Sequence, residues 1–122
     1  MIYGTGIDLV LFEQMKFACK KQKKFYSYIL TGEEVKVYQE LNHDEKILFL
    51  TSRFAIKEAF SKAMGTGIGK TVNFQNITVI DNVKGQAIIT DSPFDGNIFL
   101  STSHSESMLI AQVLLEKIEI ES

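Results

Sequence analysis

The sequence has 122 residues with a single cysteine, a single proline and no tryptophan. Cys19 therefore has no partner for an internal disulfide, and no histidine stands near it at the spacing of a metal site, so we interpret it as structural. No apolar run approaches the ~18–20 residues of a membrane-spanning helix. The first residues also lack the charged start and apolar stretch of a signal peptide. These absences predict a soluble, cytoplasmic protein with no membrane partner.

Internal repeats, low-complexity tracts and long linkers are absent as well. The content of 45% hydrophobic and 23% charged residues is ordinary for a globular protein that buries a core. The length suits one such core. We expect a single domain over residues 1–122.

The formal net charge is only −2, but the charge is unevenly spread. Residues 16–24 form a lysine cluster without acidic side chains: Lys16, Lys20, Lys21, Lys23 and Lys24. Such a cluster can be the solvated face of a helix, or it can attract an acidic protein partner or a phosphate-rich ligand. Nucleic acid is disfavoured, because the cluster is short and no nucleic-acid-binding motif accompanies it.

The first half of the chain predicts one strand and three helices. The expected ranges are a strand over 2–10 and helices over 13–25, 31–41 and 44–64. Thr31 and Glu34 form a capping box that begins the second helix. Asp44 is the expected N-cap of the third helix, and Gly65 is its natural C-terminal stop. The glycines of the first strand allow another backbone or a ligand to come close.

Strand-forming residues dominate after Gly67. The expected strands cover 76–81, 85–90, 97–103 and 108–118 and follow one another as a meander. This order predicts an α+β fold, with an antiparallel sheet packed on a long buried helix with shorter helices. The last strand is apolar from 108 to 115 except at Gln112, so it is either a central core strand or a contact with a partner subunit.

The long helix carries a carboxylate at an unexpected position. Glu58 extends a stripe of Ile, Leu and Phe, where burying an unpaired carboxylate is costly. One explanation is an ion pair with Lys62 at i,i+4 spacing. The other is a hard cation shared with Asp8 of the first strand, since magnesium takes one or two protein carboxylates and completes its shell with water and phosphate oxygens.

The remaining sector of the same helix is basic. Lys46, Arg53 and Lys57 lie between its two apolar faces, and we expect them to reach solvent.

Two short motifs are similar to catalytic signatures but lack required parts. Segment 65–71 misses the glycine that a phosphate loop needs one position earlier, although its backbone N–H groups can bind an oxyanion or simply form a flexible helix exit. His104 stands among hydroxyls, where it can contact phosphate, carry a proton or complete a hydrogen-bonded turn. A serine hydrolase built on Ser103 and His104 is disfavoured, because the chain has no G-x-S-x-G elbow.

Four segments together resemble the holo-acyl-carrier-protein synthase family, the small bacterial type of 4'-phosphopantetheinyl transferase. They are Gly4–Leu9, Ile29–Glu34, Arg53–Gly69 and Ser101–His104, and they cover nearly the whole chain. The third is the most specific, because a seventeen-residue pattern around a Lys-Glu-Ala core followed by Gly-Thr-Gly is very unlikely by chance.

The resemblance implies a magnesium-dependent enzyme with the 4'-phosphopantetheinyl transferase fold. Such enzymes transfer the phosphopantetheine arm of coenzyme A to a serine of an acyl carrier protein and release adenosine 3',5'-bisphosphate. Asp8 and Glu58 match the magnesium ligands, and Glu58 and Lys62 match the catalytic positions. The positions matched to coenzyme A binding are Arg53, Lys62, Gly65, Gly67 and His104. Family members are homotrimers with sites between subunits, which would account for the apolar last strand.

Acyl carrier proteins are acidic, so the resemblance also gives the lysine cluster a role. The expected carrier-binding residues are Lys16, Lys20 and Lys24. The chain departs from the family at Leu11 and Gln14, where acidic and arginine residues are common, and at Gly85-Gln86-Ala87, where Gly-x-Pro is usual. The first departure bears on carrier docking, and neither touches the metal site. The alternative function is a non-catalytic module that binds an acidic protein partner.

Overall fold

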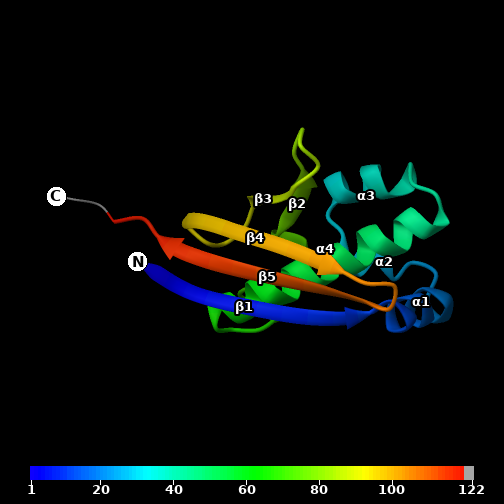
Figure 1. The fold of residues 1–122 in the computed structure, drawn as a ribbon, viewed down its shortest axis with the longest axis horizontal. Coiled ribbons are helices and arrows are strands. Elements are labelled where there is room, and N and C mark those ends of the chain that lie inside the picture. The colour runs from blue at the N-terminus through cyan, green and yellow to red at the C-terminus, as the bar shows by residue number, and fades with distance from the viewer. Residues whose placement is uncertain (120–122) are drawn as a thin grey trace.

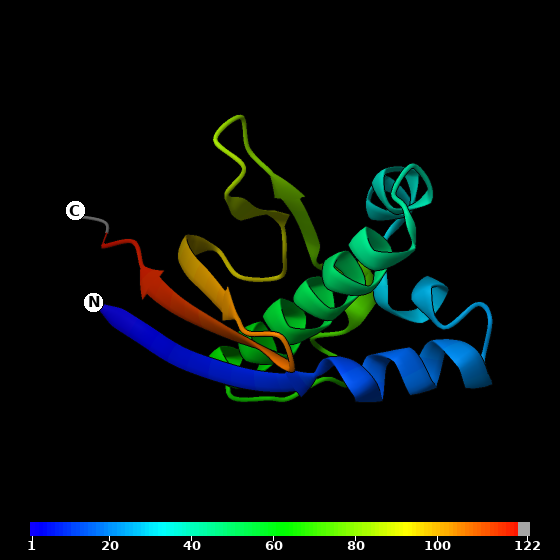
Figure 2. The same ribbon diagram turned by 45° about the vertical axis from the view of Figure 1, so that its right-hand side comes forward.

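The computed structural model describes residues 1–119. Its elements are β1 (Ile2–Leu11), α1 (Phe12–Lys21), α2 (Tyr26–Ile29), α3 (Gly32–Gln39), α4 (His43–Met64), the 3-10 turn η1 (Phe74–Asn76), β2 (Thr78–Asp81), β3 (Ala87–Asp91), β4 (Gly96–His104) and β5 (Met108–Lys117). The sheet of β1, β5 and β4 packs on α4, while α2, α3 and the smaller sheet of β2 and β3 lie on the other side of this helix (Figure 1, Figure 2). This arrangement confirms the predicted α+β class.

The strands form two separate antiparallel sheets, so the prediction of one meander is wrong. The larger sheet has the order β1-β5-β4, and β2 pairs with β3 alone. Gly85, at φ 81°, supports the turn between β2 and β3. The link that follows β3 contains Pro93, which cannot donate a ladder hydrogen bond, and it carries the chain across to the other sheet.

The last strand, β5, is central in the larger sheet but is buried on one face only. Its inward face is fully buried and consists of Leu109, Ala111, Val113 and Leu115. Ile110 and Leu114 point to the opposite face, where they are half-buried beside exposed apolar residues of the flanking strands. The inward face fits the expected core strand, and the apolar outer face leaves the expectation of a partner subunit as a prediction.

Glycines in β1 allow the larger sheet to lie directly on α4, as the sequence predicts. A Cβ atom at Gly4 would lie 2.0 Å from the Ala63 carbonyl oxygen, and one at Gly6 would lie 1.9 Å from that of Ala59. Side chains of any size are excluded at both positions. The backbone contact brings the next inward-facing residue of β1, Asp8, beside the flank of α4.

The helix ends agree with the sequence in part. The capping box of Thr31 and Glu34 is present, and Gly65 ends α4 in the left-handed region at φ 82°. The N-cap of α4 is Asn42 and not Asp44, because the Asn42 side chain accepts the backbone N–H of Glu45 at 2.9 Å. The first helix ends at Lys21, short of the predicted end at residue 25.

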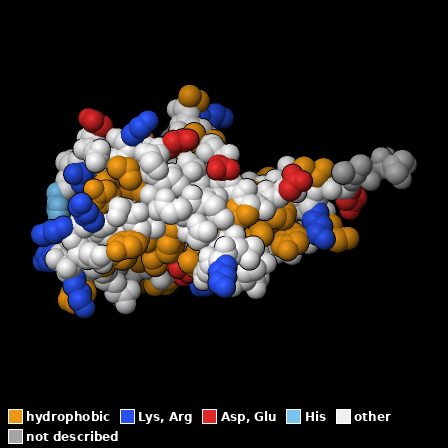
Figure 3. All heavy atoms as spheres, turned by 180° about the vertical axis from the view of Figure 1, so that it is seen from behind, with side chains coloured by type: hydrophobic (Ala, Val, Ile, Leu, Met, Phe, Trp, Pro, Cys, Tyr) orange, Lys and Arg blue, Asp and Glu red, His pale blue; other side chains and the backbone are white. Residues whose placement is uncertain are grey.

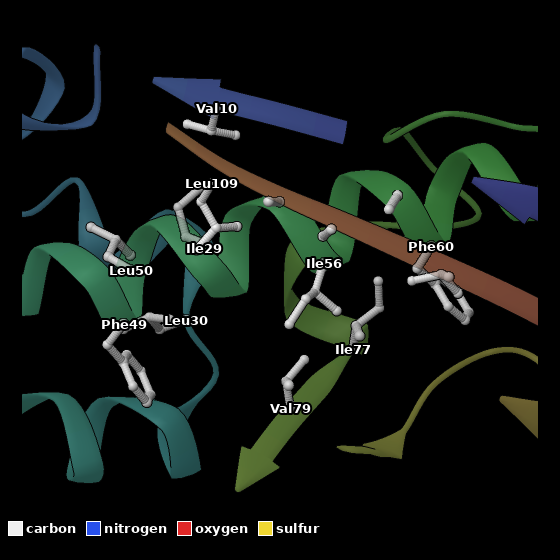
Figure 4. Close-up of a cluster of buried hydrophobic side chains, with 14 of the residues drawn as sticks. Val10, Ile29, Leu30, Phe49, Leu50, Ile56, Phe60, Ile77, Val79 and Leu109 are labelled. Carbon is white, nitrogen blue, oxygen red and sulfur yellow. The ribbon is translucent and has the colours of Figure 1, made fainter. Parts of the chain in front are cut away.

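Apolar side chains surround α4 on two sides (Figure 4). Val10 and Leu109 of the larger sheet lie on one side, and Ile77 and Val79 lie on the other. Between them the helix is so enclosed that even some charged side chains are buried. No helix within residues 1–119 combines the length and the apolar composition that a membrane crossing requires.

The prediction that Arg53 and Lys57 reach solvent is therefore wrong. Arg53 is only 5% exposed and Lys57 is fully buried. Both side chains find acids from other elements, since Asp81 pairs with Arg53 and Glu34 pairs with Lys57. The sequence pattern of one helix cannot reveal partners that the tertiary fold supplies. Lys46 is half-buried over the ring of Tyr38.

Candidate active site

Three charged side chains converge where β1 crosses α4. Asp8 lies on the face of β1 that packs on the helix, two residues beyond Gly6. Lys62 of α4 reaches back to this strand, and its Nζ lies 3.0 Å from Asp8 Oδ1 and donates to the Ile7 carbonyl at 3.0 Å. Glu58 lies one helical turn before Lys62 on the same side of α4. We call Asp8 and Glu58 the acid pair.

The predicted ion pair between Glu58 and Lys62 is not formed. Lys62 pairs with Asp8 instead, and within residues 1–119 no ion pair or hydrogen bond ends on the Glu58 carboxylate. Burial raises the pKa of Glu58 above its ordinary value, the nearby charge of Asp8 raises it further, and Lys62 opposes both. Two carboxylates from distant segments thus lie close together, and that of Glu58 has no hydrogen-bond or ion-pair partner among the described residues.

The acid pair fits a hard divalent cation. Two protein carboxylates suffice for magnesium, because water and substrate phosphates complete its octahedron. A cation between them would offset the repulsion that raises the pKa of Glu58. The described residues hold no larger cluster of three or more possible metal-binding side chains.

The raised pKa of Glu58 predicts how the stability of the metal-free protein depends on pH. The folded state binds the proton of Glu58 more tightly than the unfolded chain does. This tighter binding stabilises the folded protein below the ordinary pKa of 4.5, and the stabilisation is lost as pH rises through the pKa of Glu58 in the folded state. We expect the free energy of unfolding, measured with urea in EDTA, to fall over that range. Glu58→Gln should lack this decrease, and an identical slope in both proteins would contradict the assignment.

Arg53 and His104 lie on a second site, a cavity of about 310 Å³ between α4, the β2–β3 hairpin and the end of β4. Polar residues that line this Arg53 cavity include Ser52, Arg53, Asp81, Thr102 and His104. The guanidinium of Arg53 donates to Ser52 Oγ and to Asp81 Oδ1, both at 3.0 Å, and lies 4.0 Å from the ring of Phe49. Its Nε is buried without a hydrogen-bond partner. The site therefore offers a guanidinium cation held in place by two hydrogen bonds.

The two sites lie on opposite sides of α4. At ~100° per residue, Arg53 and Lys62 point about 180° apart around the helix. Gly65 and Gly67, both at positive φ, lie in the loop just beyond Lys62. One copy of the chain thus brings Asp8, Glu58 and Lys62 together but separates them from Arg53 and His104.

Sequence reasoning missed Asp81 and the buried pair of Glu34 and Lys57. The capping box located Glu34 at the start of a helix, but it gave no sign that the same carboxylate meets Lys57. Ser103 and His104 face opposite sides of the sheet as neighbours in β4, which is unsuited to a serine hydrolase.

The lysine cluster lies at one end of the molecule. Phe12 and Met15 bury the inner face of α1, which leaves the lysines exposed. Figure 3 shows that Lys and Arg side chains gather at the end where α1 lies. Lys24 stands in the turn beyond α1, and Lys16 makes an exposed contact with Glu13 at 3.8 Å. Exposed pairs of this kind contribute little to stability, so the cluster is free to meet a partner.

Comparison with known proteins shows the family to which this chain belongs. The profile of the 4'-phosphopantetheinyl transferase superfamily matches residues 4–114. The chain therefore belongs to this superfamily.

Within it, the chain is similar to proteins named holo-[acyl-carrier-protein] synthase. The relative from Enterococcus faecalis is 45% identical over 116 residues, covering 95% of this chain and 98% of the relative, and that from Levilactobacillus brevis is 41% identical over 117 residues, covering 96% of each. The crystal structure of the Bacillus anthracis synthase in complex with CoA (3',5'-ADP) superposes with a TM-score of 0.89 at 41% identity and covers 97% of this chain and 99% of that one. That agreement confirms the resemblance seen in the sequence.

Proposed function

We propose that this protein transfers 4'-phosphopantetheine from coenzyme A to a serine of apo acyl carrier protein. The products are holo acyl carrier protein and adenosine 3',5'-bisphosphate. The observation that carries the proposal is the convergence of Asp8, Glu58 and Lys62 in a chain of this superfamily. We also propose that it acts in the cytoplasm, where this chemistry would meet its carrier.

The reaction exchanges one phosphorus–oxygen bond for another. The serine hydroxyl oxygen bonds to the phosphorus that carries the pantetheine arm, and the bond from that phosphorus to the bridging oxygen of the diphosphate breaks. Glu58 orients the hydroxyl or accepts its proton, directly or through water. The ammonium of Lys62 stabilises the charge that develops on the departing bisphosphate.

Asp8 and Glu58 would hold Mg²⁺ in this proposal. The ion, when bound, supplies Lewis-acid and template chemistry at the diphosphate. Lys62 then keeps its place beside Asp8 through the carbonyl of Ile7, to which it already donates. The positive charge of Lys62 also limits the repulsion between the two carboxylates before the ion arrives.

We propose that the nucleotide of coenzyme A is held by Arg53, His104 and the backbone around Gly65 and Gly67. The guanidinium of Arg53, which lines the cavity together with His104, suits a phosphate oxygen. The positive φ of Gly65 and Gly67 forms a loop free of side chains, in which their N–H groups donate to the carbonyls of Lys62 and Ser61. Because α4 separates Arg53 from the acid pair, one ligand can contact both only if two copies of the chain contribute.

A homotrimer with sites between subunits meets this requirement. The outer face of the larger sheet supports it: Ile7, Leu9 and Phe99 are 59%, 51% and 55% exposed there. Contiguous apolar area of this kind is a common mark of subunit contact. We expect light scattering to give the mass of three chains, and a monomer at all concentrations would contradict the shared site.

The lysine cluster is the proposed docking surface for the acidic carrier. A single charge reversal, Lys16→Glu or Lys20→Glu, should raise the KM for carrier protein about tenfold with little change in kcat, because these residues steer association and do not touch the reacting atoms. Added salt should then raise the KM for carrier protein less in the variant than in the parent. Lys36→Glu, an exposed reversal on α3, is the matched control. Equal effects of both reversals would assign the loss to net charge alone.

The decisive test is mass spectrometry of an apo carrier protein incubated with the chain, coenzyme A and Mg²⁺. We expect a gain of one phosphopantetheine that EDTA abolishes. No gain with several carriers and folded protein would contradict the proposal. The alternative, a non-catalytic module that uses the lysine cluster, predicts carrier binding without chemistry that persists in Glu58→Gln and Asp8→Asn.

A further inference from the structure

A fully buried ion pair lies on the side of α4 that faces α2 and α3. Lys57 Nζ lies 2.6 Å from Glu34 Oε1, and both side chains are inaccessible to solvent. The ammonium also donates to the carbonyls of Ile29 at 2.7 Å and Phe74 at 2.9 Å. Its three donors are thus satisfied, and it joins α4 to the end of α2 and to η1.

The carboxylate of Glu34 extends the connection to β2. Its Oε1 accepts the backbone N–H of Thr31 at 2.7 Å, and its Oε2 accepts that of Val79 at 2.8 Å. A buried ion pair is a weak source of stability, because its desolvation offsets most of its attraction. The pair also makes four hydrogen bonds to backbone groups of α2, α3, η1 and β2 or their ends. These bonds indicate that the pair fixes the positions of these elements relative to α4.

A second ion pair joins α4 directly to β2. Arg53 NH2 lies 3.0 Å from Asp81 Oδ1. Arg53 precedes Lys57 by one helical turn, about 6 Å along α4, and Asp81 follows Val79 by two residues, about 6.6 Å along β2. The spacings match, so both bridges form together in one register of β2 on α4. A slip of one residue would turn Asp81 away from Arg53.

We propose that the pair of Glu34 and Lys57 is a positioning device for the Arg53 cavity. It sets the register of β2, which places Asp81 where it orients the guanidinium of Arg53 toward the ligand. The inference rests on the proposed function, because it takes the cavity to receive the nucleotide of coenzyme A. Glu34 and Lys57 themselves do not touch the ligand, since both are fully buried.

The test uses a double variant, Glu34→Leu with Lys57→Met, which removes both charges and leaves no unpaired ion. We expect a folded protein whose Kd for coenzyme A, measured by calorimetry, is weakened about tenfold, because a displaced guanidinium binds phosphate poorly. The Nε–H resonance of Arg53 should exchange faster with water than in the parent. If this variant does not fold, Glu34→Gln with Lys57→Gln carries the same prediction, since it also removes both charges.

Two controls separate positioning from stability. Leu115→Ala removes a buried side chain under the larger sheet, so it should lower stability yet leave the Kd for coenzyme A unchanged. Asp81→Asn should weaken binding in the parent and add little in the double variant, because both act through Arg53. Unchanged affinity in the double variant, or fully additive losses, would overturn the inference. A parent chain that does not bind coenzyme A would instead contradict the proposed function.

Discussion

Glu58→Gln is expected to lower the rate of carrier modification by about a hundredfold or more without weakening the fold. The substitution keeps the shape of the side chain but removes the charge that a divalent cation and a serine proton require. Stability should be preserved, because no ion pair or hydrogen bond within residues 1–119 depends on the Glu58 carboxylate and because its repulsion with Asp8 disappears. Transfer activity should therefore fall while the free energy of unfolding does not.

Single-turnover transfer and urea unfolding, measured on the same preparation, check this expectation. Glu40→Gln removes an exposed carboxylate at the end of α3 and is the matched control, which should keep parental activity. Asp8→Asn should also abolish transfer, but it should cost some stability because Lys62 loses its partner. A Glu58→Gln protein with activity within about fivefold of the parent would exclude Glu58 from the metal and proton roles.

The contrast between Glu58 and Lys57 shows how far sequence reasoning reaches in this chain. The position of Glu58 on an apolar stripe singled it out as an unusual carboxylate, and burial does raise its pKa. The same pattern failed for Lys57 and Arg53, because a basic sector on a helix has the same periodicity whether it faces water or acids from other elements. Helix periodicity shows which side chains share one face of a helix. It does not show which other helices or strands pack on that face.

The sheet offers the same lesson at a larger scale. Alternation and turn residues located every strand to within a few residues, since these signals are local. The division into two sheets depends on where the chain goes after β3, which is decided by packing around α4 and not by the strand sequences. Asp8, Glu58, Lys62, Arg53 and His104 were singled out from the sequence one by one, yet the position of α4 between the acid pair and the Arg53 cavity follows only from the fold.

Gly6→Ala is the variant expected to damage the fold most. The added Cβ would lie 1.9 Å from the Ala59 carbonyl oxygen and 2.8 Å from the backbone N of Ala63, so β1 and α4 must move apart. Because both neighbours are backbone atoms of a buried helix, no rotamer change can relieve the contact, and we expect a loss of about 3 kcal/mol in the free energy of unfolding. Asp8, two residues further along β1, moves with the strand, so transfer activity should fall even where the protein remains folded.

Gly32→Ala provides the control that separates a steric cause from a general effect of replacing glycine. Nothing lies within 4 Å of a Cβ at Gly32, which begins α3 at an exposed position. That substitution should therefore leave stability within about 0.5 kcal/mol of the parent or raise it slightly, since alanine reduces the entropy of the unfolded chain. Urea unfolding of both variants gives the comparison. Equal stability of Gly6→Ala and Gly32→Ala would mean that β1 does not rest on the backbone of α4, and the convergence of Asp8 with Glu58 and Lys62 would lose its structural basis.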